Sequence, residues 1–95
     1  MTTDEYLDGA VTLLQQLIAT PSASRNEDKA ADIMENTISS YGLTVHRKGN
    51  NIWTIDPEYD ESRQTLLLNA HIDTVKPVAT WNRDPYSPEI EDDRL

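Results

Sequence analysis

The sequence predicts an α/β fold in which helices cover both faces of a small sheet. Two segments carry apolar residues at helical spacing, two short segments read as the strands of a hairpin, and Leu66, Leu67 and Leu68 are consecutive. A strand that is apolar on both faces is typical of the centre of a sheet with helices on both sides. We therefore expect two helices, a hairpin and a central buried strand.

The first helix is expected over residues 4–19. Thr2 or Thr3 is suited to cap it, and the acidic residues of its first turn suit the helix dipole. Pro21 ends the helix, because the residue before a proline is pushed out of the helical conformation. The following Pro-Ser segment is interpreted as a connector. The apolar stripe comprises Leu7, Ala10, Val11, Leu14, Leu17 and Ile18.

The second helix is expected to run to about Ser40. Its start is predicted by residues 24–27, which match a capping box, with a hydroxyl at the N-cap and a Glu three positions later. Gly42 follows at the position where a left-handed residue commonly ends a helix. The residues expected to be buried are Ala30, Ala31, Ile33, Met34 and Ile38.

A hairpin is expected next, with strands over residues 43–47 and 51–56 joined by a turn at residues 48–50. His46 lies in the first strand. We interpret it as an exposed strand residue rather than a metal ligand, because no second ligand type lies at a useful spacing. Residues 57–64 are polar and acidic, as expected of a surface loop.

Composition restricts the kinds of partner. The chain has 95 residues, no cysteine and a net charge of −9. A strongly acidic chain is unsuited to nucleic acid or an anionic membrane surface, and without cysteine there are no disulfides or thiolate metal sites. There is neither a signal-peptide pattern nor an apolar run long enough to span a membrane, so we expect a cytoplasmic protein.

His71 and Asp73 are the candidate site residues. They follow the expected central strand at its carboxyl end, where ligands bind in open α/β sheets, and lie two positions apart, so they face the same way. A neutral imidazole is a common zinc ligand, and a nearby carboxylate can orient it. A His-x-Asp pair also occurs by chance. On the residues alone, a hydrogen-bonded core histidine is an equal alternative.

The segment over residues 74–93 is expected to form an ordered loop at the rim of the cleft that His71 faces. Three prolines exclude helix through most of it, and Trp81, Tyr86 and Ile90 indicate that it packs down. Long loops without secondary structure are uncommon unless they are functional or disordered. The alternative is a plain surface loop.

Two segments carry a resemblance to a known family. Residues 67–75 (Leu-Leu-Asn-Ala-His-Ile-Asp-Thr-Val) resemble the first metal-site motif of the zinc-dependent amidohydrolases and peptidases, which include acetylornithine deacetylase, succinyl-diaminopimelate desuccinylase, aminoacylase and carboxypeptidase G. Residues 81–95, with Asp-Pro-Tyr-Ser-Pro and an acidic stretch, resemble the next block of that family. The order of the elements before them also fits, so the resemblance spans essentially the whole chain.

The resemblance implies that residues 1–95 are an incomplete N-terminal portion of a three-layer α/β/α zinc-peptidase-like catalytic domain. The rest of that domain and any dimerisation domain would be absent. It implies that His71 is a ligand to one of two zinc ions, for which cobalt can substitute, and that Asp73 is the active-site aspartate that supports it. The family's bridging Asp, general-base Glu and second His have no counterpart here, and no other cofactor-binding residue is implied.

The implied activity is hydrolysis of the N-acyl amide bond of a small amino acid derivative by a homodimer, most like acetylornithine deacetylase of arginine biosynthesis. We expect the 95-residue piece to be inactive, to bind zinc weakly if at all, and to self-associate through unpaired strand edges. The alternatives are another family member (a desuccinylase or a carboxypeptidase-like enzyme), a degenerate relative without the metal set, and a non-catalytic α/β interaction domain with a buried His71.

Overall fold

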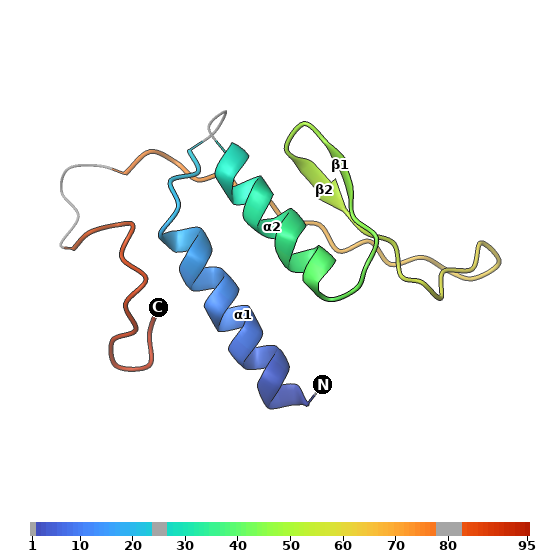
Figure 1. Ribbon diagram of the computed structural model, residues 1–95, viewed down its shortest axis with the longest axis horizontal. Coiled ribbons are helices and arrows are strands. Elements are labelled where there is room, and N and C mark those ends of the chain that lie inside the picture. Colours follow the sequence, from blue (N-terminus) through green and yellow to red (C-terminus); the bar gives the residue numbers. More distant parts are fainter. Residues whose placement is uncertain (1, 24–26, 78–82) are drawn as a thin grey trace.

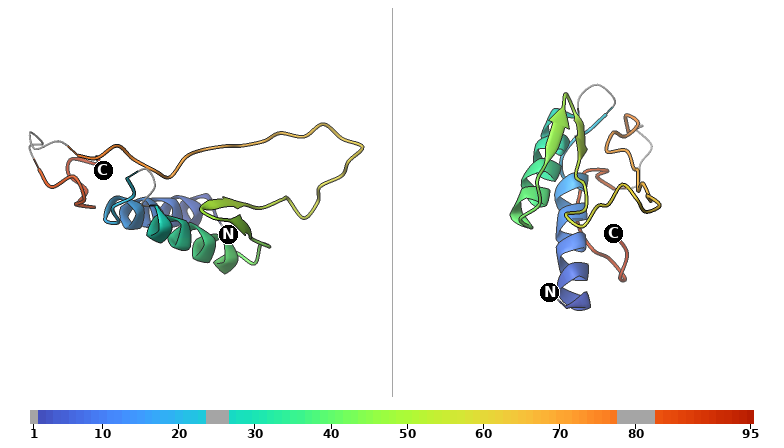
Figure 2. Two further views of the ribbon diagram at one scale, coloured as in Figure 1. Left: turned by 90° about the horizontal axis from the view of Figure 1, so that it is seen from above. Right: turned by 90° about the vertical axis from the view of Figure 1, so that its right-hand side faces the viewer.

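The computed structural model describes residues 2–23, 27–77 and 83–95. Two helices lie side by side, and a two-stranded hairpin lies beside the second (Figure 1). A long segment then runs along one face of this layer and back past the helices (Figure 2). The radius of gyration is 15.7 Å, against about 12 Å for a compact domain of this length, so the chain is extended.

Helix α1 spans Thr3–Ile18, within one residue of the prediction at each end. Thr2 is the N-cap, and its hydroxyl accepts a hydrogen bond of 3.1 Å from the Glu5 amide. The apolar stripe is only partly covered, because Leu7 and Leu14 are 60% and 48% exposed. The helix therefore forms from its own periodicity and cap without a filled core behind it.

Helix α2 spans Asp28–Ser40 and carries the buried centre of the structure, with Ala30 and Ala31 both 0% exposed. Its start differs from the prediction. Glu27 is the N-cap and makes no side-chain capping bond, so it does not hold the third helical position that a capping box would give it. The rest of the predicted box, residues 24–26, lies outside the described residues. Gly42 ends the helix with φ +77°, as predicted.

The predicted hairpin is confirmed, with shorter strands. Strand β1 spans His46–Lys48 and β2 spans Asn51–Trp53, paired antiparallel. His46 is exposed, as predicted, and its ring stacks on Trp53 with centroids 5.5 Å apart.

Arg47 fastens this hairpin to α2. Its Nη1 donates to Asp32 Oδ1 at 2.7 Å and to Glu35 Oε2 at 2.9 Å, and the bonds to these two carboxylates raise the pKa of Arg47. A second connection lies at the turn, where Asn50 Nδ2 donates to Asp28 Oδ1 at 2.7 Å. Charged hydrogen bonds of this length are stronger than neutral ones. The hairpin therefore has a defined position against the helix.

The predicted central buried strand is not formed. Leu66, Leu67 and Leu68 are 82%, 81% and 85% exposed, and β1 and β2 are the only strands in the described part of the chain. No backbone hydrogen bond joins residues 64–72 to another described backbone group. A strand needs a neighbour to pair with and layers to cover it, and here the hairpin pairs only within itself. The described residues thus give an α/β arrangement without the second helical layer.

Two glycines in different conformations give the first prediction. Gly42→Ala places a side chain in the left-handed region and should lower the free energy of unfolding by about 1 kcal/mol. Gly9→Ala is the matched control: its new Cβ would meet only the hydroxyl of Tyr41, at 2.7 Å, which is the movable end of a side chain 44% exposed. Because alanine favours helix, this variant should be neutral or stabilised by up to about 1 kcal/mol in urea unfolding. Equal destabilisation of both variants would contradict the assignment.

Candidate metal-ligand site at His71

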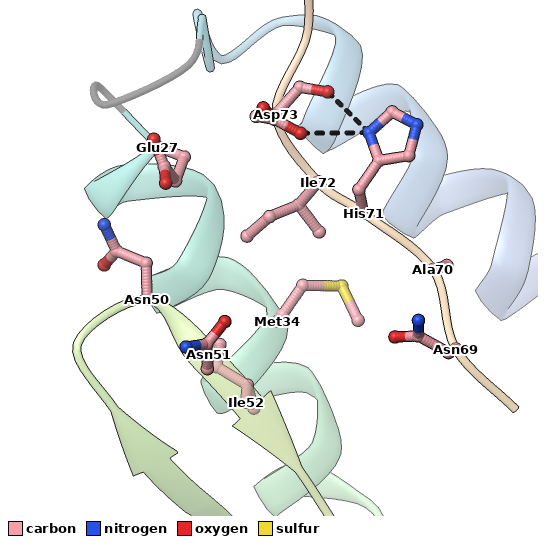
Figure 3. Close-up of a pocket in the computed structure, with 10 residues that line it drawn as sticks. All are labelled: Glu27, Met34, Asn50, Asn51, Ile52, Asn69, Ala70, His71, Ile72 and Asp73. Atoms are coloured by element: carbon pink, nitrogen blue, oxygen red, sulfur yellow. Dashed lines mark hydrogen bonds and ion pairs between the residues drawn. The ribbon is translucent and has the colours of Figure 1, made fainter. Parts of the chain in front are cut away.

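His71 and Asp73 line a hollow of about 550 Å³ between the start of α2, strand β2 and the segment over residues 69–73 (Figure 3). The hollow is built from three stretches that are far apart in the sequence. Its lining comprises Glu27, Met34, Asn50, Asn51, Ile52, Asn69, Ala70, His71, Ile72 and Asp73.

The His71 ring is oriented by Asp73. Its Nδ1 lies 3.0 Å from Asp73 Oδ1 and 2.9 Å from Asp73 O. Both partners are acceptors, so in the neutral imidazole Nδ1 carries the proton and Nε2 keeps its lone pair. The spacing of two residues brings the side chains together, as predicted. The interpretation of His71 as a buried core histidine is wrong, because its side chain is 85% exposed.

The walls of the hollow differ in character. Ile72 and Met34 point toward each other across its centre, and Asn50 and Asn51 contribute polar groups from the hairpin (Figure 3). Glu27 Oε2 is buried and has no hydrogen-bond partner among the described residues. Sequence reasoning did not single out Glu27, Asn50 or Asn51, because each carries only a local signal of a helix start or a turn.

A backbone contact holds the site segment against the helical layer. The Thr74 amide donates to Ser22 O at 2.8 Å, and Thr74 forms a parallel bridge with Ala23. Ser22 is 4% exposed, so this hydrogen bond lies in a protected place. The Pro-Ser connector, interpreted from the sequence as a plain loop, therefore anchors the segment that carries His71.

The loop that was expected to form the rim of the cleft at His71 does not border the hollow in its described part. None of residues 83–95 lines the hollow, and Pro85 and Tyr86 instead line a separate groove with Leu17 and Ile18 of α1. Glu91 pairs with Arg83 at 2.7 Å. Trp81 lies outside the described residues. The loop thus packs on α1, where Gln15 Nε2 donates to Pro88 O at 3.0 Å.

His71 has the arrangement of one ligand in a zinc site. In such sites one ring nitrogen binds the metal while the other donates to a carboxylate that fixes the ring. A catalytic zinc needs about three protein ligands and a water. Across residues 2–23, 27–77 and 83–95, no group of three His, Asp or Glu side chains is placed to hold a metal ion. The described residues therefore fit one ligand and its support rather than a complete site.

Comparison with known proteins supports the same family as the motif at residues 67–75. No family model matches the chain. It is 34% identical over 93 residues to succinyl-diaminopimelate desuccinylase of Ehrlichia ruminantium (strain Gardel), covering 90% of this chain and 24% of that protein. It is 28% identical over 94 residues to the desuccinylase of Anaplasma marginale (strain Florida), covering 94% and 25%. It is 30% identical over 101 residues to acetylornithine deacetylase of Edwardsiella ictaluri (strain 93-146), covering 94% and 26%.

These similarities identify the chain as a homologue of enzymes named as a desuccinylase and a deacetylase. In particular, it is homologous to the N-terminal quarter of the family that contains succinyl-diaminopimelate desuccinylase and acetylornithine deacetylase. The predicted resemblance is confirmed. The chain spans about a quarter of the length of these relatives. No helix in the described part of the chain is long and apolar enough to cross a membrane.

The ring orientation gives the second prediction. With the ring neutral, ¹⁵N NMR should find His71 mainly in the Nδ1–H tautomer. In Asp73→Ala the carboxylate acceptor is lost and the preference should weaken. His46, stacked on Trp53, is the internal control and should not change. A mainly Nε2–H tautomer of His71 in the unmodified chain would contradict this geometry.

Proposed function

We propose that residues 1–95 form the N-terminal part of the catalytic domain of a zinc-dependent amidohydrolase, with His71 as a metal ligand and Asp73 as its orienting carboxylate. The observation that carries this proposal is the His71 Nδ1–Asp73 Oδ1 contact of 3.0 Å on an exposed imidazole. The motif resemblance and the homology support the same assignment.

In this proposal, Asp73 orients the His71 ring. By accepting the Nδ1 hydrogen bond, it keeps the proton away from Nε2 and holds the ring at one angle. Nε2 is then free to bind a cation. The chemistry that a bound zinc ion supplies is activation of water and polarisation of the substrate carbonyl. Two zinc ions, with cobalt as a substitute, are part of the proposal, and their other ligands and the general base would come from the rest of the protein.

The hollow beside His71 suits one side of an amide substrate. Ile72, Met34 and Ile52 offer apolar contact, while Asn50 and Asn51 present amide groups able to donate and accept hydrogen bonds. Sites for small ligands combine such apolar walls with a few placed polar groups. We assign this hollow to substrate positioning next to the metal.

The substrate class is an N-acyl amino acid. The motif resemblance favours an acetylornithine-like substrate and hence arginine biosynthesis, whereas the relatives bear the names of both a succinyl-diaminopimelate desuccinylase and an acetylornithine deacetylase. Both named substrates are N-acyl derivatives of diamino acids. We therefore propose an N-acyl diamino acid without choosing between the two. A homodimeric, cytoplasmic enzyme is the accompanying prediction.

A chimera tests the activity. Residues 1–95 would replace the aligned quarter of the Ehrlichia ruminantium desuccinylase, and hydrolysis of N-succinyl-diaminopimelate and N-acetylornithine would be measured. We expect His71→Ala to abolish hydrolysis and Asp73→Ala to lower metal affinity or activity by about 10–100-fold. His46→Ala is the control and should keep full activity. An active chimera that tolerates His71→Ala would refute the ligand assignment.

Zinc binding by the 95-residue chain gives a separate prediction. Because residues 2–23, 27–77 and 83–95 place only one proposed ligand and its support, calorimetry should find no saturable binding at micromolar zinc, and the chain should hydrolyse neither substrate. Micromolar affinity that disappears in His71→Ala would show that the described residues already make a metal site, contrary to this account.

A further inference from the structure

Arg47 lies on the face of the hairpin that is turned toward α2. Arg47 and Ile52 are cross-strand partners and share this face, since neighbouring residues of a strand point to opposite faces. Ile52 lines the hollow beside His71, and Arg47 reaches two carboxylates of α2. The same face of the hairpin therefore carries part of the candidate site and the cation that fixes the hairpin in place.

The guanidinium of Arg47 joins the helix to the turn of the hairpin. Besides its bonds to the two carboxylates of α2, its Nε donates to Gly49 O at 2.8 Å and its Nη2 donates to Asn50 Oδ1 at 3.1 Å. Four hydrogen bonds thus hold one planar group against both elements. Arginine offers five N–H donors in a rigid fork, whereas lysine offers one flexible ammonium. The arrangement therefore depends on the shape of the guanidinium as well as on its charge.

The turn that this guanidinium holds forms part of the lining of the hollow. Asn50 and Asn51 both line it. Asn50 is held a second time, because its Nδ2 donates to Asp28 Oδ1 at 2.7 Å, and Asp28 directly follows Glu27, another lining residue. Figure 3 shows Asn50 and Asn51 on one side of the hollow and His71 on the other. A displacement of the turn would therefore change the side of the hollow that lies across from His71.

The two neighbouring asparagines use their amides differently. Asn50 uses both ends of its amide, since Oδ1 accepts from Arg47 and Nδ2 donates to Asp28. The Asn51 side chain makes no hydrogen bond to another described residue (Figure 3). Asn50 therefore orients the turn, while the amide of Asn51 remains available to donate and accept hydrogen bonds in the hollow.

We propose that Arg47 is a positioning residue for substrate binding in the site beside His71. By holding Gly49 and Asn50 against α2, it places the Asn51 amide where that amide binds a polar group of the substrate. The inference rests on the proposed function, in which the hollow receives one side of an N-acyl diamino acid. Arg47 does not itself line the hollow, so it acts through the turn and does not touch the substrate.

Positioning of this kind has a distinct kinetic effect. A misplaced Asn51 weakens binding of the substrate and of the transition state alike, which raises KM and leaves kcat nearly unchanged. A merely structural loss of folded protein would instead lower the apparent kcat and leave KM unchanged. The affinity for zinc should not respond, because Arg47 does not line the hollow and the His71 ring is held by Asp73.

Arg47→Lys in the chimera with the Ehrlichia ruminantium desuccinylase tests the role of the guanidinium. This variant keeps the charge but loses the fork, so KM should rise at least about fivefold while kcat changes less than about twofold. Arg63→Lys is the matched control, because the Arg63 side chain is 76% exposed and lies 3.7 Å from Asp60, and its KM should not change. An unchanged KM in Arg47→Lys, or an equal rise in Arg63→Lys, would overturn the inference.

Asp28→Ala is a milder variant that reaches the same turn from α2. It removes the second bond to Asn50 and should raise KM about threefold. Asp4→Ala makes the same change in the first turn of α1 and should leave KM unchanged. Equal KM values in these two variants would count against a turn that positions the substrate. Circular dichroism of each variant would check that the helices remain folded.

The chimera with Arg47 intact separates this inference from the proposed function. If it hydrolyses neither N-succinyl-diaminopimelate nor N-acetylornithine, the proposed function fails and the role of Arg47 fails with it. If it hydrolyses one of them, loses that activity in His71→Ala and keeps its KM in Arg47→Lys, only the role of Arg47 is overturned.

Discussion

The hydrogen bond from the Thr74 amide to Ser22 O is the constraint on which the candidate site depends. At 2.8 Å, with Ser22 only 4% exposed, it fixes the end of a segment whose preceding residues 64–72 have no other backbone hydrogen bond to the described chain. Arg47 fixes the opposite wall by joining the hairpin to α2. Between these two attachments lies the hollow that His71 and Asp73 line. Local attachments, rather than a large core, thus position the site.

The elements that the sequence predicted well are those that depend on local physics. The helices follow from apolar periodicity and the Thr2 cap, the hairpin from its turn, and the helix end from Gly42. The contact between His71 and Asp73 also follows from a spacing of two residues. Each of these features needs only neighbours within a few positions along the chain, so the sequence pattern contains the necessary information.

The elements that the sequence predicted poorly depend on partners far away in the chain. The burial of Leu67 was inferred from its apolar neighbours, but burial of a strand requires other strands and layers, and the described residues provide none for it. Glu27 and Asn50 meet the site segment only after folding, so no local pattern marks them as lining the hollow. The exposure of Leu66, Leu67 and Leu68 and the incomplete candidate site at His71 have the same physical explanation: this segment is suited to contacts that the described residues do not make.

The most direct test is amide hydrogen exchange in dilute solution. The Thr74 amide should be protected, because it is hydrogen-bonded to the carbonyl of buried Ser22, while the amides of Leu66, Leu67 and Leu68 should exchange at the rates of an unstructured peptide. Ser22→Gly removes the side chain but keeps the carbonyl that accepts the hydrogen bond from the Thr74 amide. This variant is therefore the control for the Ser22 side chain. Exchange at Thr74 as fast as at the leucines would mean that the segment carrying His71 is not held in place, and would contradict the account.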